Sequence, residues 1–327
     1  MNKRLSIAQY RDGLLSGDRI LLAKSITLIE SKLESDQKLA EALLSEIIPY
    51  TGKSLRIGIS GVPGVGKSTF IEAFGTFLCE KDHRVAVLAV DPSSTLSKGS
   101  ILGDKTRMNA LAVNPRAFIR PSATGGTLGG VASKTRESIL LCEAAGYTHI
   151  LIETVGVGQS ETLVREMVDF FLLLMLAGAG DELQGIKRGI MEICDALLIN
   201  KADGDTIKAA NRAAADYRNA LHLYREHESG WAARVQTVSS INKVGMDEVY
   251  TLINDYEGLV RSNGFFEKNR HQQNLAWLME LIRLELLQNF ETFQRTDPVW
   301  KSETESLKMG ISPVRTVFQN IIKAYKH

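Results

Sequence analysis

Short apolar runs alternate with segments of helical periodicity through the middle of the chain, from about residue 54 to 258. The runs have the length and composition of buried strands, and they lie at 55–60, 84–90, 117–120, 149–153, 170–176, 196–200 and 234–239. Most are separated by segments with helical spacing, at 69–81, 134–145, 185–194 and 204–222. This alternation predicts an α/β fold with a mostly parallel sheet and helices on both faces.

Helical periodicity also dominates both ends of the chain. Apolar residues recur three and four apart in segments 21–35 and 37–50, and Pro49 and Gly52 mark the break before the central region. An apolar stripe runs from Phe265 to Phe293, and a last short helix is expected after Pro313. The stripe fits either packing against the central domain or a subunit interface. We therefore expect an N-terminal helical segment (1–50), a central α/β domain (51–260) and a C-terminal helical arm (261–327).

Composition narrows the class of protein. The 327 residues include 39 Lys and Arg against 38 Asp and Glu, so no overall basic field attracts nucleic acid or anionic lipid. The cysteines, Cys79, Cys142 and Cys194, are too few and too far apart for a disulfide scaffold or a paired-cysteine metal site. The longest apolar run, 170–177, is far below the roughly 20 residues of a membrane span. We expect a cytoplasmic protein without a nucleic-acid or membrane partner.

A phosphate-binding loop follows the first predicted strand. The sequence GVPGVGKS at 61–68 fits the pattern G-x-x-x-x-G-K-[ST] and leads into a predicted helix. Its backbone N–H groups would bind phosphate oxygens beside the positive end of that helix, Lys67 would reach the β- and γ-phosphates, and the Ser68 hydroxyl would coordinate Mg²⁺. The nucleotide contacts are assigned to Gly61, Val62, Pro63, Gly64, Val65, Gly66, Lys67, Ser68 and Thr69. The motif predicts a nucleoside triphosphate but does not identify its base.

The base is indicated by the NKAD sequence at 200–203, which follows a predicted strand. In an NKxD arrangement the carboxylate of Asp203 can accept hydrogen bonds from the ring N–H and the amino group of guanine, which adenine cannot supply. Lys201 would lie along the ring face and brace the phosphate loop, next to Asn200. The loop at Ser239, Ser240 and Ile241 is expected to offer backbone N–H groups to the guanine carbonyl.

Carboxylates at the ends of predicted strands are candidate Mg²⁺ ligands. Asp91 ends one strand run and Glu153 ends another, and Asp104 is a third candidate. Glu153 begins the sequence ETVG, which occupies the place of the Asp-x-x-Gly motif of many GTPases. The next residue, Val157, stands where Ras-like GTPases carry a water-orienting glutamine. We therefore expect slow intrinsic hydrolysis unless Gln159, Glu153 or a partner positions the water.

Several segments together resemble one family. They are GVPGVGKST, VLAVDPSS, GSILGDKTRM, LGGVASKTRE, ETVGVGQSE, LAGAGDELQGIKRGIMEICD and NKAD. The resemblance is to the methylmalonyl-CoA mutase-associated GTPases, which are the bacterial MeaB or ArgK-type proteins and their mitochondrial counterpart. It spans essentially the whole chain. It implies a P-loop GTPase that acts as a chaperone of adenosylcobalamin-dependent methylmalonyl-CoA mutase, gates cofactor loading, protects the mutase, and forms a homodimer through its C-terminal helices.

The resemblance also carries over site residues. Lys67 and Ser68 match the phosphate-loop pair, and Asp91, Asp104 and Glu153 match the acidic Mg²⁺ and switch positions. Segment 178–189 matches a segment thought to couple nucleotide state to the mutase, within which Lys187 would approach the nucleotide. The catalytic residues are therefore expected to be Lys67, Glu153 and Lys187. The serine at 240 replaces the alanine common in the family, a change expected to be harmless in a loop acting through backbone N–H groups.

Two other functions fit the phosphate loop. A nickel-delivery GTPase would need a Cys/His relay cluster, whereas the histidines here are scattered and have no cysteine beside them. A phosphotransferase, of the kind named for transport of basic amino acids, would need an acceptor site with a base, and most small-molecule kinases use ATP rather than GTP. The identity of the client and the nucleotide state that binds it are not encoded in any motif.

Overall fold

The computed structural model describes residues 4–90, 108–121, 128–154, 160–178, 188–222 and 227–326. The metal candidates Asp91 and Asp104, together with Val157, Gln159 and Lys187, lie outside these residues. By its internal contacts the chain divides into two compact units, Met1–Gln273 and Asn274–His327. Each unit has its own architecture, and the nucleotide-binding motifs belong to the first.

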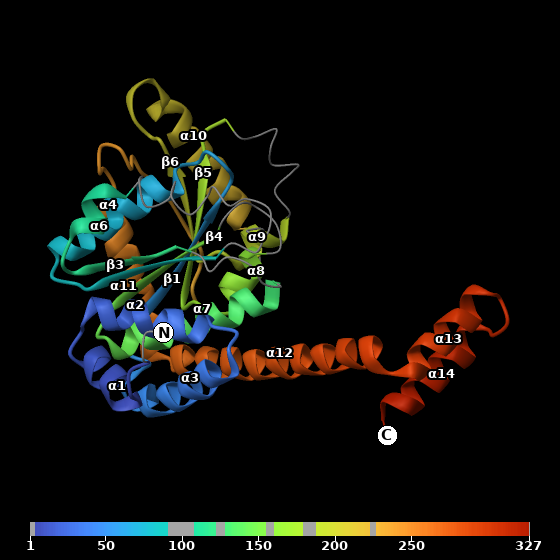
Figure 1. Ribbon diagram of the computed structural model, residues 1–327. Coiled ribbons are helices and arrows are strands. Elements are labelled where there is room, and N and C mark those ends of the chain that lie inside the picture. Colours follow the sequence, from blue (N-terminus) through green and yellow to red (C-terminus); the bar gives the residue numbers. More distant parts are fainter. Residues whose placement is uncertain are drawn as a thin grey trace. The chain divides into compact units, whose positions relative to one another are not determined.

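The first unit is built on a parallel sheet with strand order β3-β2-β4-β1-β5-β6-β7 (Figure 1). The strands are Leu55–Gly61 (β1), Val85–Val90 (β2), Ala117–Arg120 (β3), His149–Thr154 (β4), Phe170–Leu176 (β5), Ala196–Asn200 (β6) and Arg234–Thr237 (β7). The predicted α/β fold is confirmed. Strand β7 ends before the predicted run does, because Ser239 leaves the ladder and pairs with Val244.

Helices connect and flank these strands. They are α1 (Ile7–Leu15), α2 (Arg19–Glu30), α3 (Glu34–Ile47), η1 (Ile48–Tyr50), α4 (Lys67–Glu80), α6 (Asn109–Val113), α7 (Leu128–Ala144), α8 (Ser160–Arg165), α9 (Arg188–Ile193), η3 (Gly204–Thr206), α10 (Ile207–Leu221), α11 (Met246–Ser262) and the start of α12 (Phe265–Thr296). Helix α7 begins six residues before its predicted start, in a stretch that contains Gly129 and Gly130. No separate bounds were predicted for helix α1, which begins at a capping box of Ser6 and Gln9.

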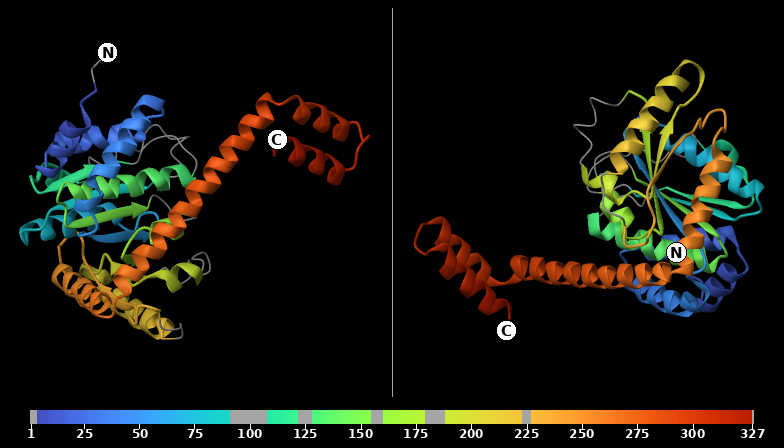
Figure 2. Two further views of the ribbon diagram at one scale, coloured as in Figure 1. Left: turned by 90° about the horizontal axis from the view of Figure 1, so that it is seen from below. Right: turned by 180° about the vertical axis from the view of Figure 1, so that it is seen from behind.

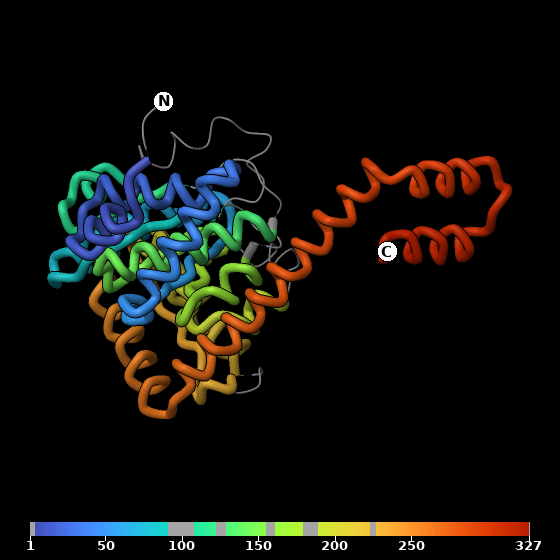
Figure 3. The backbone as a smooth tube through the Cα atoms, turned by 60° about the horizontal axis from the view of Figure 1, so that its bottom comes forward, coloured from blue at the N-terminus to red at the C-terminus, as the bar shows by residue number. Residues whose placement is uncertain are grey.

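The two faces of the sheet carry separate hydrophobic cores. Helices lie on both faces of the sheet (Figure 2). Alternate residues of β5 point to opposite faces, so that Phe171 belongs to one core and Phe170 to the other. Helices α1–α3 and α7–α10 cover the first face, and α4, α6, α11 and the first turn of α12 cover the second. The N-terminal helices α2 and α3 pack against α7 (Figure 3). Burial on both faces explains why the strands read as continuous apolar runs.

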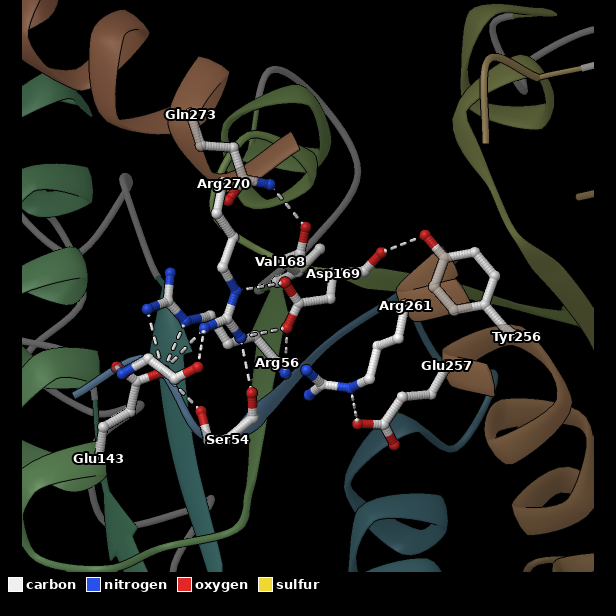
Figure 4. Close-up of polar contacts among 11 residues, drawn as sticks. Ser54, Arg56, Glu143, Val168, Asp169, Tyr256, Glu257, Arg261, Arg270 and Gln273 are labelled. Atoms are coloured by element: carbon white, nitrogen blue, oxygen red, sulfur yellow. Dashed lines mark hydrogen bonds and ion pairs between the residues drawn. The ribbon is translucent and has the colours of Figure 1, made fainter. Parts of the chain in front are cut away.

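A buried polar cluster closes the amino-terminal edge of the sheet (Figure 4). We call it the Arg270 cluster; it consists of Ser54, Arg56, Glu143, Asp169 and Arg270. The Arg270 guanidinium donates from Nε and Nη2 to the two carboxylate oxygens of Asp169, at 2.8 and 2.7 Å. It also donates to the carbonyl of Gly52 at 2.8 Å and to that of Ser54 at 2.6 Å. One side chain of α12 therefore joins the approaches to β1 and β5.

Glu143 of α7 completes the Arg270 cluster. Its carboxylate accepts hydrogen bonds from the Gly52 N–H at 2.8 Å, the Ser54 hydroxyl at 2.6 Å and the Arg56 Nε at 3.0 Å. Its side chain is fully buried. Burial alone would lower the pKa of Arg270, but the hydrogen bonds and charge of Asp169 outweigh burial and raise that pKa. Because the buried charges are paired and hydrogen-bonded, the cluster avoids the large cost of isolated buried ions.

A histidine pair at the same edge makes stability depend on pH. The rings of His83 and His149 lie 4.3 Å apart, and the Tyr250 hydroxyl lies 2.9 Å from His83 Nε2. Burial, together with the charge of His83, lowers the pKa of His149 from 6.5 to about 3. Between these two values the unfolded chain binds a proton at His149 that the folded chain does not, so the folded state loses stability as the pH falls.

We expect His149 to account for about 2 kcal/mol of the free energy of unfolding lost between pH 7 and pH 5. In His149→Gln that part of the pH dependence should disappear, whatever the substitution does to the free energy of unfolding at pH 7. Urea unfolding of the full chain at pH 7, 6 and 5 measures the difference. The exposed His271 supplies the control, since His271→Gln should keep the wild-type pH dependence. Equal pH dependence in wild type and His149→Gln would contradict the assignment.

The second unit contains the rest of α12 and a helical hairpin of α13 (Pro298–Lys308) and α14 (Val314–Tyr325). Helix α13 was not predicted, although Asp297 caps it through the Val299 N–H at 2.8 Å and Pro298 begins it. Aromatic rings hold the unit together: the Phe290 ring lies 5.1 Å from the ring of Tyr325 and 5.7 Å from that of Trp300. Among the described helices, none combines the length and apolar character that a membrane span requires.

Candidate functional site

The phosphate loop lies at the carboxyl end of β1, in the middle of the sheet, and leads directly into α4. Gly66 is the residue before the helix and has a φ of +94°, where a side chain would be strained. A Cβ at this position would also lie 2.9 Å from the side-chain nitrogen of Asn200. Glycine is therefore required both by the turn and by the close approach of the base-reading strand.

Lys67 and Ser68 occupy the first turn of α4. The Lys67 ammonium donates to the Gly61 carbonyl at 2.8 Å, so this side chain joins the last part of the phosphate loop to its first residue. The Ser68 hydroxyl donates to a carboxylate oxygen of Glu153 at 3.2 Å. Thr154, the residue after Glu153, donates from its hydroxyl to that of Ser60 at 2.9 Å. One contact thus ties α4 to the end of β4, and the other ties the ends of β1 and β4 together.

The oxygen atoms beside the start of α4 are suitable ligands for a magnesium ion. Ser68 and Glu153 present oxygen atoms only, and Glu153 is buried at the carboxyl end of β4. Hard cations such as Mg²⁺ prefer oxygen ligands and hold several waters besides one or two carboxylates. Among the residues that the structure describes, no three His, Cys, Asp or Glu side chains are grouped as a metal site. The assignments of Asp91, Asp104 and Lys187 fall outside those residues and stay predictions.

The base-reading sequence follows β6 and contacts the phosphate loop directly. The Asn200 side-chain nitrogen donates to the Val65 carbonyl at 2.8 Å, and Asn200 is buried. Lys201 is exposed, has a φ of +59°, and donates from its ammonium to the Gly64 carbonyl at 2.8 Å. The structure therefore places both residues against the loop, and the lysine contact corresponds to the predicted bracing of that loop.

Asp203 is held in place by the loop after β7. The Ser239 hydroxyl donates to one carboxylate oxygen of Asp203 at 2.5 Å. Asp203 also forms a capping box with Thr206 at the start of η3. Because a carboxylate has several acceptor sites, it can accept these bonds and still receive donors from a base. Ile241, the last residue of the loop assigned to guanine, is 74% exposed.

Sequence reasoning missed the part played by serine hydroxyls. Ser240 donates to the side-chain oxygen of Asn200 from its hydroxyl at 2.8 Å and from its backbone N–H at 3.3 Å. The expectation that this loop offers backbone N–H groups to guanine stays a prediction. In addition, the side chains of Ser239 and Ser240 hydrogen-bond the two base-reading residues, Asp203 and Asn200. The signal was present in the sequence as the SS pair, but only the fold brings that pair to Asn200 and Asp203.

A cavity of about 540 Å³ lies elsewhere, among residues that begin β6 and β7 and residues that end α9 and α10. Cys194, His222 and Trp231 are among the residues that line it. It shares no residue with the phosphate loop or the NKAD sequence and opens at the amino-terminal ends of its strands. The candidate nucleotide site is therefore the arrangement at the carboxyl edge, where ligands of open parallel sheets bind.

Known proteins with similar sequences include several that are named as GTPases. The sequence model of the family described as methylmalonyl-CoA mutase-associated GTPase MeaB matches residues 22–295. GTPase ArgK of Escherichia coli is 44% identical over 316 residues, which are 97% of this chain and 96% of that protein. The mouse protein called methylmalonic aciduria type A homolog, mitochondrial, is also 44% identical, over 96% of this chain and 78% of its own length.

The fold is also found in a solved structure. A crystal structure described as that of an LAO/AO transport system kinase superimposes with a TM-score of 0.79 and 37% identity, and the match covers all of both chains. The present chain therefore shares its fold with that structure.

Proposed function

Because the chain belongs to the methylmalonyl-CoA mutase-associated GTPase MeaB family, we propose that it serves as a GTP-dependent chaperone of an adenosylcobalamin-dependent methylmalonyl-CoA mutase. In this role it would gate cofactor loading and protect the mutase from inactivation. The observation that supports the GTP assignment is the position of the NKAD segment against the phosphate loop, through the contacts of Asn200 with Val65 and of Lys201 with Gly64. The mutase assignment is supported by the family description.

One group of residues in the site would bind the base, and another would bind the phosphates. Asp203 accepts two hydrogen bonds from guanine, and Asn200 and Lys201 keep the base-reading segment against the loop. The loop N–H groups and Lys67 bind the phosphates, since the positive end of α4 and the ammonium both stabilise negative charge. Released from the Gly61 carbonyl, the Lys67 ammonium would move to the β- and γ-phosphates.

Mg²⁺ would be held by Ser68 and Glu153, with Asp91 and Asp104 as further candidates. The bound ion neutralises phosphate charge. Glu153 would in addition orient a water, with Lys187 as a further catalytic candidate. With Val157 in the place of the water-orienting glutamine, the intrinsic rate should be slow and should rise when a partner completes the site.

Single-turnover GTP hydrolysis, with and without purified methylmalonyl-CoA mutase, tests this function. We expect the mutase to accelerate phosphate release, and we expect the acceleration to be absent with an unrelated acyl-CoA enzyme of similar size. No acceleration by the mutase would refute the chaperone role while leaving GTP binding intact. Transfer of the labelled γ-phosphate to a small metabolite would instead support a phosphotransferase.

A homodimer through α12 is part of the proposal. Beyond Gln273 this helix exposes apolar side chains at helical spacing: Leu275, Leu278, Ile282 and Leu286 are 64, 51, 43 and 56% exposed. Such a stripe on one helix is typical of an interface, because water-exposed apolar surface of this extent is unfavourable. The sequence left two readings of this stripe open, packing against the central domain and a subunit interface, and the proposal takes the second.

We expect the double variant Leu278→Glu, Ile282→Glu to be monomeric at concentrations where the wild type is a dimer. Two buried carboxylates on each side of an interface would be unpaired, which disfavours association by several kcal/mol. Sedimentation velocity gives the oligomeric state directly. The exposed Gln288 provides the control, as Gln288→Glu adds a charge to the same helix and should leave the dimer intact. A wild type that sediments as a monomer would contradict the proposal.

A further inference from the structure

The turn at 201–203 is held by a residue outside the NKAD sequence. This residue is Thr206, which ends η3. The Asp203 N–H donates to the Thr206 hydroxyl oxygen at 3.3 Å. The same hydroxyl donates to the Asp203 carbonyl at 2.7 Å and lies within hydrogen-bonding distance of the Lys201 carbonyl. One hydroxyl group therefore joins both ends of the turn.

The turn needs such support because part of its backbone is strained. Lys201 has a φ of +59°, in the left-handed region that is unfavourable for a residue with a side chain. A bond to the Lys201 carbonyl fixes the peptide that follows this residue and thus the direction of the chain towards Asp203. The Ala202 N–H donates to the Val238 carbonyl at 3.0 Å and ties the same turn to the end of β7.

The carboxylate of Asp203 is thus held through two sets of contacts. Ser239 contacts the side chain at 2.5 Å, and Thr206 contacts the backbone on both sides of the Asp203 Cα atom. Loss of the Thr206 hydroxyl would leave the Ser239 bond but would free the turn that carries the carboxylate. Because recognition depends on side chains that supporting contacts keep in place, Thr206 can affect base binding without touching the base.

We propose that Thr206 is a positioning residue for guanine recognition, which holds the turn at 201–203 so that the Asp203 carboxylate faces the base. The inference rests on the proposed function, in which Asp203 binds guanine. Thr206 acts through backbone groups of Lys201 and Asp203. Helix α10 does not depend on its side chain, because Thr206 makes no side-chain cap at the start of that helix.

Calorimetric titration with GDP in the presence of Mg²⁺ tests the proposal. Thr206→Val keeps the branched shape of the side chain but removes the hydroxyl. We expect its affinity for GDP to be about three- to tenfold weaker than that of wild type, the range for loss of a hydrogen bond of ordinary net strength. Thr206→Ser keeps the hydroxyl and should stay within about twofold of wild type.

A double-mutant cycle separates this role from a general loss of stability. In an Asp203→Asn background the base contact is already impaired, so Thr206→Val should weaken GDP binding by less than about twofold further. Thr251 of α11 supplies the matched control, because its exposed hydroxyl donates to the Asp247 carbonyl at 2.9 Å. Thr251→Val removes the same kind of bond and should leave the affinity for GDP unchanged.

Wild-type affinity for GDP in Thr206→Val would overturn the proposal. An effect of full size in the Asp203→Asn background, or an equal loss in Thr251→Val, would overturn it as well. If Thr206→Val does not fold, Thr206→Ala also lacks the hydroxyl and carries the comparison with Thr206→Ser. A wild type that binds GDP and ADP equally would instead refute the base assignment within the proposed function, so the two failures are distinguishable.

Discussion

Asp203→Asn is expected to weaken GTP binding by roughly 10²- to 10⁴-fold, because two hydrogen bonds to a charged acceptor, each about 1.5–3 kcal/mol, are affected. The carboxylate can accept from both the ring N–H and the amino group of guanine. An amide presents one oxygen and one NH₂, and the NH₂ would face the guanine amino group as donor against donor. Calorimetric titration with GTP and GDP measures the loss.

The contacts around Asp203 indicate that this substitution should leave the local fold unchanged. Asparagine is as good a helix cap as aspartate, so the turn into η3 should persist. The Ser239 hydroxyl, now 2.5 Å from a carboxylate oxygen, can still donate to the amide oxygen. The change therefore acts on the base contact rather than on the fold.

Xanthine nucleotides provide the positive test. Xanthine carries a carbonyl where guanine carries its amino group, so the amide introduced by Asp203→Asn would match it donor to acceptor. The variant should therefore bind XTP more tightly than GTP, which reverses the wild-type preference. The neighbouring Asp205 is exposed, and Asp205→Asn should keep wild-type affinity for GTP. Unchanged GTP affinity in Asp203→Asn, or equal wild-type affinity for ATP and GTP, would remove the base assignment.

The sheet could be predicted from the sequence because its strands are buried on both faces. Strand β5 shows this best: its apolar sequence FFLLLML matches the observed strand at both ends. The predicted bounds were less accurate for helices whose sequence signals are a few local residues, such as caps and glycines. The glycines of α7 delayed its predicted start, and the capping residues of α1 and α13 were overlooked. Burial leaves a strong pattern in the sequence, whereas caps and helix starts depend on single residues.

Within the candidate site, too, some features could be predicted from the sequence and others could not. The loop at 61–68 is one continuous stretch of sequence, and so is the NKAD sequence at 200–203. The residue pattern within each stretch was therefore enough to identify it. The hydroxyl contacts of Ser239 to Asp203 and of Ser240 to Asn200 join residues more than 30 positions apart. No local pattern records such pairs, because they exist only once β6 and β7 are neighbours in the sheet.

The Arg270 cluster is the clearest case of structure without a sequence signal. Asp169 and Arg270 are 101 residues apart, and Ser54 lies 115 residues before Asp169. Their contacts form where three segments meet at the amino-terminal edge of the sheet (Figure 4). A sequence shows only an isolated arginine in a helix rich in charged residues, and such an arginine is ordinarily solvent-exposed.

Arg270→Ala is expected to lower the free energy of unfolding of the first unit by about 3–5 kcal/mol, since removal of one partner leaves Asp169 as an uncompensated buried charge. The carbonyls of Gly52 and Ser54 would lose their donors as well. Urea unfolding of the full chain, followed by circular dichroism, measures the loss. The melting temperature should fall by about 10 °C on the scale expected for a unit of this size.

Arg261 supplies a matched control, because its guanidinium lies 3.8 Å from the centre of the Phe266 ring that Arg270 also covers, at 4.3 Å. Arg261 pairs with Glu257, at 2.8 Å, and is 38% exposed. Arg261→Ala therefore removes a similar cation–π contact and a partly exposed ion pair, with an expected cost of about 1 kcal/mol or less. The difference between the two variants isolates the buried bonds to Asp169 and the two carbonyls. Equal losses in both would mean that the Phe266 contact, rather than the buried cluster, is what Arg270 contributes.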